Sequence, residues 1–436
     1  MIKLLLLALA VLAAASACEF EYEDFILGEP VEYVKSDAGE IRALMGSHED
    51  LSLKERDVAL GFITMEPRAL LLPHYMDASL VFYVQKGDAM IGSIRGESTV
   101  KKDLKRGDVY TVPAGAVFYV LNANEDEKLE LIGIFDTSRG SRSGKLQSFF
   151  VGGGLHPKLA LAGFRSGLLA AAFKVSEEEI KNVFGSQDGG PIIPTSVGMF
   201  ARLKGQENYL ESVVSNKKHK KDEDKKHKKH KDDKKHKKDE DDKKHKDDDK
   251  KHKEDEDKEK RKDKIFNLFE KRAFENQHGW IASTLGEDVQ ALASGRIGVS
   301  IVKLQAGSFL APHWSKQGAE FGVVTNGTGS LQVALPNGTN GVDAKLNAGT
   351  IFHVPQFFPA SQIAATHECL EFVSFTVAAD SRSEVTEGIQ FLAGRGSVLE
   401  KLELGILALS FNLPDHLVSS FLASQDDAAI LANDIQ

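Results

Sequence analysis

Residues Phe309–Trp314 (FLAPHW) and Glu320–Gly327 (EFGVVTNG) decide the fold, because the same pattern occurs earlier in the chain. The earlier copy is Leu70–Tyr75 (LLLPHY) followed by Leu80–Gly87 (LVFYVQKG). The chain therefore contains an internal repeat, which predicts two similar domains in tandem.

A second pair of motifs extends the repeat. Gly107–Pro113 (GDVYTVP) matches Gly349–Pro355 (GTIFHVP), so the loops between the motifs are nearly equal in length. The segments between the motifs are short, apolar and rich in β-formers, with Gly, Pro or Asn between them. Such a series indicates a sandwich or jelly-roll barrel. Strands are expected at 61–65, 89–94 and 130–135 in the first half, and at 298–302, 331–335 and 371–377 in the second.

Each half ends in helices. Residues 168–173 and 175–184 have apolar residues at helical spacing, and Ser176 with Glu179 forms a capping-box pattern. Helices at 406–411 and 413–422 repeat this arrangement. Their apolar stripes must be buried against something, either the flank of the barrel or a neighbouring subunit. The stripe residues are Ile180, Val183 and Phe184 in the first half and Val418, Phe421 and Leu422 in the second.

The predicted fold class is all-β with helical appendages: two tandem barrels, each followed by a C-terminal helical arm. We divide the chain into a signal peptide (1–17), a first barrel with its arm (18–205), a disordered linker (206–264) and a second barrel with its arm (265–436).

The linker contains a tract of charged residues, Lys217–Lys264, with no apolar residue. Its charge is +6, whereas the whole chain carries −9, so the remaining chain is acidic. This balance argues against a nucleic-acid partner. The tract cannot bury apolar surface, so we expect a solvated, disordered spacer. The alternative is weak multisite binding of Zn²⁺ or Cu²⁺ by its histidines. These are His219, His227, His230, His236, His245 and His252.

The N-terminus resembles a secretory signal peptide. Lys3 precedes the uncharged apolar run Leu4–Ala14, and Ala15–Ala17 supplies small residues for cleavage. The alternatives for this segment are a membrane anchor and a bacterial lipoprotein with Cys18 lipidated. After cleavage we expect no membrane contact. The secretory pathway is therefore the predicted route.

Two sequons and two cysteines fit this route. Asn326 and Asn337 each begin an Asn-Gly-Thr triplet, which is a glycosylation acceptor if exposed and also a common turn. Cys18 and Cys369 are the cysteines of the chain, and their pairing stays open. Two cysteines do not make a disulfide scaffold.

The repeated motifs resemble those of the cupins. Cupin barrels that perform metal chemistry hold Mn, Fe or Cu with three histidines and a glutamate. The first half keeps His74, but the other positions hold Met76, Leu80 or Val81, and Phe118, which would fill the barrel as core.

The second half keeps two of the four ligands, His313 and Glu320, and has Ser315 and Ala360 at the others. We interpret His313 and Glu320 as a hydrogen-bonded pair, with a degenerate metal site as the alternative. His353 and His367 are further histidines that could approach. No cofactor is required on this interpretation, although an adventitious divalent metal such as Zn²⁺ or Cu²⁺ is possible.

Several stretches, in order, resemble the vicilins, the 7S storage globulins of plants, and specifically the vicilin-like group. They are 70–77 (LLLPHYMD), 149–154 (FFVGGG), 169–184 (LAAAFKVSEEEIKNVF), 190–193 (GPII), 266–280 (FNLFEKRAFENQHGW) and 354–363 (VPQFFPASQI). The resemblance implies a non-catalytic bicupin that serves as an amino-acid reserve in protein storage vacuoles, with extracellular deposition as the alternative location. It also implies a homotrimer clasped by the helical arms. The alternative functions are a germin-type oxidase, or a protective protein holding metal or a small ligand in the second barrel.

Overall fold

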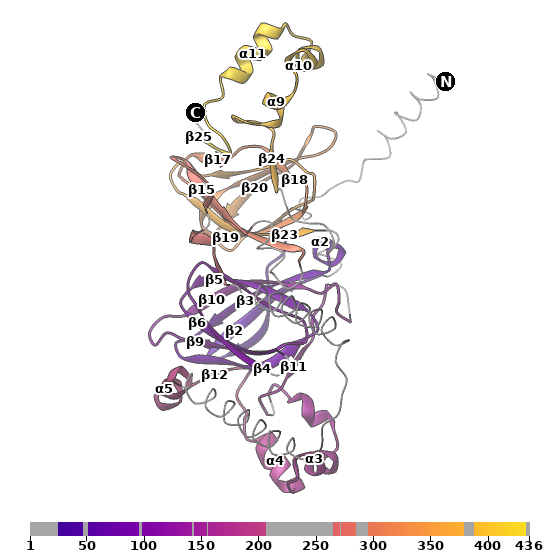
Figure 1. The fold of residues 1–436 in the computed structure, drawn as a ribbon, viewed down its shortest axis with the longest axis vertical. Helices are drawn as coiled ribbons and strands as arrows, with labels where there is room; N and C mark the ends of the chain where they lie inside the picture. Colours follow the sequence, from indigo (N-terminus) through magenta and orange to yellow (C-terminus); the bar gives the residue numbers. More distant parts are fainter. Residues whose placement is uncertain are drawn as a thin grey trace, which may run out of the picture.

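The computed structural model describes residues 25–46, 51–95, 98–141, 144–154, 156–205, 265–270, 272–284, 295–378 and 388–432. Two β-barrels are stacked along the long axis, and a group of helices lies at each far end (Figure 1). The signal peptide, the whole linker with its six tract histidines, and Cys18 lie outside these residues. The all-β class with helical appendages is confirmed.

The first barrel consists of two facing sheets, as the short alternating strands of the first half predict. One sheet has the order β1-β2-β3-β10-β5-β8-β13: Val31–Ser36, Gly39–Met45, Val58–Met65, Leu129–Asp136, Ser79–Lys86, Asp108–Val112 and Phe266–Asn267. The other has the order β11-β4-β9-β6-β7, with β12 beside β4: Ser148–Phe150, Ala69–Met76, Val117–Asn122, Ala89–Arg95, Ser98–Leu104 and Ile192–Pro194. A short helix, α2 (Leu51–Glu55), packs beside β3.

The second barrel is one connected sheet, because the long strand β19 (Gly318–Ala334) takes part in both faces. A bulge between Val324 and Asn326 marks the bend in this strand. The path of the sheet is β14-β15-β16-β23-β19-β22-β17-β25: Arg272–Asn276, Gly279–Ser283, Ile297–Leu304, Leu370–Ala378, then β19, Ala360–Ala364, Ser308–Leu310 and Ile430–Ala432. Four strands lie off this path: β18 (His313–Ser315), β20 (Asn340–Asn347), β21 (Ile351–Val354) and β24 (Ile389–Phe391).

Each half of the chain contributes a short strand to the barrel of the other half. Ile26 forms a bridge with Phe352, and the Leu27 amide donates to the Ile351 carbonyl at 3.0 Å. Reciprocally, β13 pairs with β8 of the first barrel, where Phe266 lies opposite Val109. The two barrels are therefore joined through backbone pairing at both crossings.

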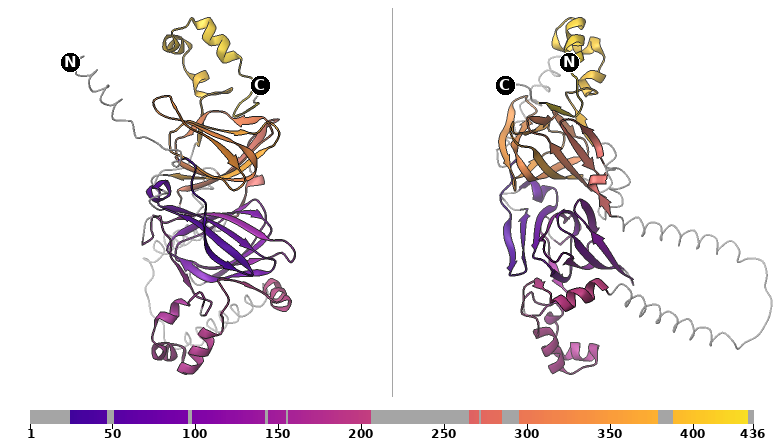
Figure 2. Two further views of the ribbon diagram at one scale, coloured as in Figure 1. Left: turned by 180° about the vertical axis from the view of Figure 1, so that it is seen from behind. Right: turned by 90° about the vertical axis from the view of Figure 1, so that its left-hand side faces the viewer.

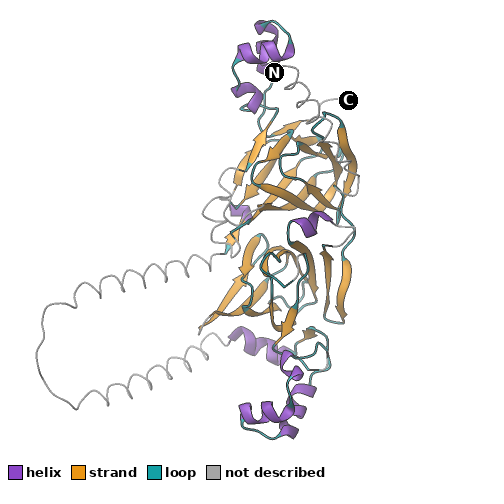
Figure 3. Ribbon diagram, turned by 90° about the vertical axis from the view of Figure 1, so that its right-hand side faces the viewer, coloured by secondary structure: helices purple, strands orange, loops and turns teal. Residues whose placement is uncertain are grey.

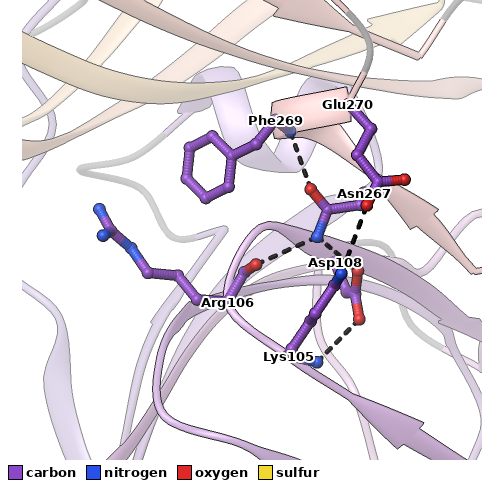
Figure 4. Close-up of polar contacts among 6 residues, drawn as sticks. All are labelled: Lys105, Arg106, Asp108, Asn267, Phe269 and Glu270. Atoms are coloured by element: carbon purple, nitrogen blue, oxygen red, sulfur yellow. Dashed lines mark hydrogen bonds and ion pairs between the residues drawn. The ribbon is translucent and has the colours of Figure 1, made fainter.

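Side chains secure the β13 crossing (Figure 4). The Asn267 amide donates to the Arg106 carbonyl at 3.1 Å and to Asp108 Oδ1 at 2.8 Å. The Lys105 ammonium reaches Glu270, in the turn η3 (Leu268–Glu270), at 3.3 Å. This polar clamp fixes the start of the second half on the first barrel.

One apolar core spans the junction. Val81 and Ile132 of the first barrel belong to the same buried cluster as Val299 and Phe375 of the second. Within this junction Arg296 lies 3.5 Å from Asp136, and both side chains are almost fully buried. The barrels thus meet in an apolar interface that contains a buried ion pair.

The arms confirm the helices expected from the sequence. The first arm contains η2 (Ala160–Gly163), α3 (Ser166–Phe173) and α4 (Glu177–Gly185), and the second contains α9 (Val398–Lys401), α10 (Leu404–Phe411) and α11 (Asp415–Ala423). The capping box forms as predicted, because the Ser176 hydroxyl accepts from the Glu179 amide and the Glu179 carboxylate accepts from the Ser176 amide.

The arms extend from opposite ends of the molecule and pack little against the barrels (Figures 2 and 3). A further helix, α5 (Val197–Gly205), lies against the first barrel, where Phe200 is buried with Met90 and Leu121. Among the described helices no single one has the length and apolarity to cross a membrane. Helices α10 and α11 reach that length and apolarity only when they are taken together, and they are bent by 106° relative to each other.

Candidate functional site

The first barrel keeps a single histidine of the expected metal set. His74 lies on β4, and its Nδ1 is 2.8 Å from the Leu72 carbonyl. Because a carbonyl only accepts, Nδ1 carries the hydrogen and Nε2 has the lone pair. Burial lowers the pKa of His74, so the ring is neutral at pH 7.

The remaining ligand positions of the first barrel are apolar. Met76, Leu80 and Phe118 are buried, with exposed fractions of 4% or less. Phe118 lies directly opposite His74 in the sheet, and their ring centroids are 4.3 Å apart. The expected loss of this metal site therefore rests on three core side chains, of which only the Met76 thioether is even a weak, soft donor.

These side chains are packed as core, as expected, although they do not fill all the space inside the barrel. A cavity of about 480 Å³ lies beside them, lined by residues from both sheets. Ala43 on β2 lies opposite Gly61 on β3, and both line the cavity. The small Ala43 side chain leaves more of the cavity open than a leucine would, whereas at Gly61 the Phe135 ring packs within 2.6 Å of where a Cβ atom would lie.

The second barrel holds His313 in the same way. His313 begins β18, and its Nδ1 is 2.9 Å from the Ala311 carbonyl. Burial lowers the pKa of His313 to about 4, so this ring is also neutral at pH 7. Ala360 lies opposite His313 in the sheet. Its methyl group stands where a third histidine ligand would be needed.

Ser315 serves the turn that follows His313. The backbone amides of Gln317 and Gly318 both donate to its hydroxyl oxygen at 3.3 Å. The hydroxyl thus organises the entry into β19.

Glu320 follows in β19 and is partly buried. Burial raises the pKa of Glu320 to about 7, and a hydrogen bond from Ser374 opposes this rise. The Ser374 hydroxyl also lies 2.8 Å from that of Ser300. A carboxyl with this pKa is a weaker cation ligand than an ordinary glutamate, because it is partly protonated at neutral pH.

The expected hydrogen bond between His313 and Glu320 is absent from the described part of the chain. Their polar contacts are instead with Ala311 and Ser374 respectively. The pair was predicted from spacing alone, which does not fix where each side chain finds its nearest partner.

Neither further histidine joins them. His353 lies opposite Phe321 in the β19–β21 ladder and stacks on its ring at 4.8 Å, so it faces away from Glu320. His367 is exposed in the turn between β22 and β23. Within the described ranges, no group of three or more His, Cys, Asp or Glu side chains is placed to hold a metal ion.

The predicted glycosylation sites lie on the surface of the second barrel. Asn326 is exposed at the β19 bulge, and its amide nitrogen is 3.8 Å from Cys369 Sγ. Asn337 is exposed in the turn before β20, where its side-chain oxygen accepts from the Thr339 amide at 3.0 Å. Exposure meets the physical requirement for modification, and modification itself stays a prediction.

The structure divides the predicted interface stripes into two groups. Ile180 and Val418 are buried within their own arms, at 6% and 1% exposure. Val183 and Phe421 are more than 60% exposed. Phe184 and Leu422 are partly exposed. The first group forms the small core of each arm, so only the remaining residues are available to a partner.

Comparison with known proteins identifies a family match for both barrels. A family model described as Cupin matches residues 26–181 and 266–416. A vicilin-like seed storage protein of Arabidopsis thaliana is 30% identical over 423 residues, covering 93% of this chain and 80% of the relative. A vicilin of Corylus avellana is 24% identical over 408 residues, covering 91% of this chain and 79% of the relative.

Solved structures show the same fold. The crystal structure of vicilin from Corylus avellana aligns with a TM-score of 0.72 at 23% identity, covering 95% of this chain and 98% of that one. A vicilin from Solanum melongena aligns with a TM-score of 0.75 at 19% identity, with the same coverage of both chains. The two family matches and the 30% relative together decide the family: the chain belongs to the cupins, and within them to the vicilin-like seed storage globulins.

Proposed function

We propose that this storage globulin acts as an amino-acid reserve and performs no catalysis. The observation that carries the proposal is the identity of the side chains at the ligand positions. Met76 and Phe118 occupy the first barrel, and Ser315 and Ala360 the second. What remains in the second barrel is one neutral histidine and one partly protonated carboxyl, a set too weak to hold a catalytic metal.

Self-assembly follows from the exposed apolar surface of the arms. Leu409 is 81% exposed, Phe421 61% and Leu168 59%. Clusters of such residues on a soluble protein mark an interaction surface. The arms lie at opposite ends of the chain and repeat each other in sequence, so the first arm of one copy is suited to meet the second arm of the next. Contacts of this head-to-tail kind form a ring when the rotation from one copy to the next closes. We propose a homotrimer, with Val183, Phe184, Phe421 and Leu422 in the interface.

The proposed destination is the protein storage vacuole, reached through the secretory pathway. The signal-peptide pattern and the two exposed sequons support this route, and deposition outside the cell is the alternative.

Light scattering tests the assembly, and an oxidase assay tests the absence of catalysis. The purified mature chain at micromolar concentration should have three times the mass of one chain. With Mn²⁺, Fe²⁺ or Cu²⁺ added, it should show no turnover of oxalate above a heat-denatured control. A monomer would contradict the assembly proposal, and turnover lost in His313→Ala would contradict the non-catalytic proposal.

A further inference from the structure

The cavity of the first barrel has the form of a ligand site. Its volume of about 480 Å³ lies within the range of small-molecule pockets. Ile63 and Leu71 contribute to walls that are almost entirely aliphatic or aromatic. Tyr33 and His156, both exposed, line the cavity at its outer end. The site is therefore an apolar chamber connected to the surface.

Five polar side chains line this chamber, and His74 is the buried one among them; the others are Tyr33, Lys35, Ser148 and His156. His74 lines the cavity and is 5% exposed, and its Nδ1 hydrogen is committed to the Leu72 carbonyl. Within the described ranges Nε2 receives no hydrogen bond. The ring is held between Phe118 and Phe150, at centroid distances of 4.3 and 5.1 Å. The ring is thus held in place, and Nε2 is the hydrogen-bond acceptor that it offers to the cavity.

The protonation of the His74 ring determines which kind of ligand the cavity can bind. An Nε2 lone pair accepts from a hydroxyl group but repels a carboxylate or phosphate. The nearest cation of the lining is Lys35, an exposed residue whose ammonium is paired with Glu32 at 3.4 Å. It offers little compensation to a buried anion.

We propose that the first barrel binds a neutral, predominantly aromatic small molecule that bears one hydroxyl group, whose O–H donates to His74 Nε2. The rings of Phe118, which is tilted against His74, and Phe150, which stacks on it, favour an aromatic body beside the hydroxyl. This site is separate from His313 and Glu320 and does not depend on the storage role.

The test measures the binding of three small molecules, all built on the naphthalene ring system, to the intact mature chain. 2-Naphthol supplies the hydroxyl, naphthalene lacks it, and 2-naphthoate replaces it with an anion. Titration calorimetry at pH 7 should give saturable binding of 2-naphthol. Naphthalene should bind about fivefold more weakly, as expected for the loss of one hydrogen bond. 2-Naphthoate should bind more weakly than either.

Variants locate the site. His74→Phe keeps an aromatic ring but removes the acceptor, so it should equalise 2-naphthol and naphthalene. Ala43→Phe should fill the chamber and weaken both. His313→Phe is the matched control, because its ring is anchored to the carbonyl two residues earlier, as in His74. It should leave 2-naphthol binding unchanged.

Three results would overturn the proposal. They are no saturable binding of 2-naphthol to the folded wild type, tighter binding of 2-naphthoate, and an unchanged preference for 2-naphthol in His74→Phe. If His74→Phe fails to fold, as judged by circular dichroism, Ala43→Phe and the three-probe series on the wild type still decide the outcome.

Discussion

Leu409→Asp should dissociate the assembly without unfolding the chain. Leu409 lies on α10 and is 81% exposed in the single chain, so its side chain contributes little to the fold of one copy. Burying a whole leucine side chain contributes about 1.5–3 kcal/mol. Scaled by this exposure, the loss is roughly 1.2–2.4 kcal/mol per interface, or about 4–7 kcal/mol over the three interfaces of a trimer. That corresponds to a weakening of about 10³- to 10⁵-fold, to which the buried carboxylate adds.

Light scattering over a dilution series from micromolar to nanomolar concentration measures this shift. The wild type should stay trimeric to a much lower concentration than the variant, while their circular dichroism spectra agree. Ile94→Asp is the control, because Ile94 is 50% exposed on β6, away from both arms. If Leu409→Asp keeps the wild-type mass throughout the series, or Ile94→Asp dissociates equally, the assignment of the interface to the arms is refuted.

Two further predictions concern stability. The raised pKa of Glu320 means that the folded state holds its proton more tightly than the unfolded state, so its contribution to stability should fall as the pH rises from about 4.5 to about 7. The denaturant midpoint of Glu320→Gln, measured relative to that of the wild type, should therefore rise as the pH is raised through that interval. A difference between the two midpoints that stays the same at every pH would contradict the burial of this carboxyl. The lowered pKa of His313 acts in the opposite sense, with stability lost as the pH falls from 6.5 towards about 4, so the two must be separated by single variants. At the junction, Arg296→Met should cost about 3–5 kcal/mol in urea unfolding because it leaves the Asp136 carboxylate buried and unpaired, and adding Asp136→Leu should restore most of that loss; equal losses in both variants would contradict the role of the pair.

The sequence predicts the repeated strands and helices well, because hydrophobic period and capping are local signals. The Ser176–Glu179 capping box is an example, since both partners lie within one turn of helix. That Met76 and Phe118 belong to the core of the first barrel was equally predictable, because both are apolar residues at the positions of the cupin ligands.

The crossing of short strands between the barrels was not predicted. Phe25–Leu27 (FIL) and Phe266–Leu268 (FNL) repeat at an offset of 241 residues, which was the available signal. Strands of two or three residues are too short for a periodic pattern, and their partners lie on the other half of the chain. Only tertiary pairing reveals them.

The cavity and the side-chain partners at the second site were also beyond the sequence. Whether Met76 fills a barrel depends on the residues facing it from other strands, such as Ala43 and Gly61. Likewise, His313 and Glu320 form hydrogen bonds with Ala311 and Ser374. The spacing of the cupin motif does not take these neighbours into account. Sequence patterns identify candidate groups, and packing decides what they contact.

Metal stoichiometry tests the central claim most directly, namely that neither barrel retains a working metal centre. The mature chain with residues 217–264 deleted should be loaded with Mn²⁺, Fe²⁺, Cu²⁺ or Zn²⁺, passed over a chelating resin and measured by elemental analysis. The deletion removes the tract histidines from the measurement. We predict well under one metal ion per chain for every metal. One equivalent retained per chain by the wild-type barrels, and lost in His313→Ala, would contradict the account.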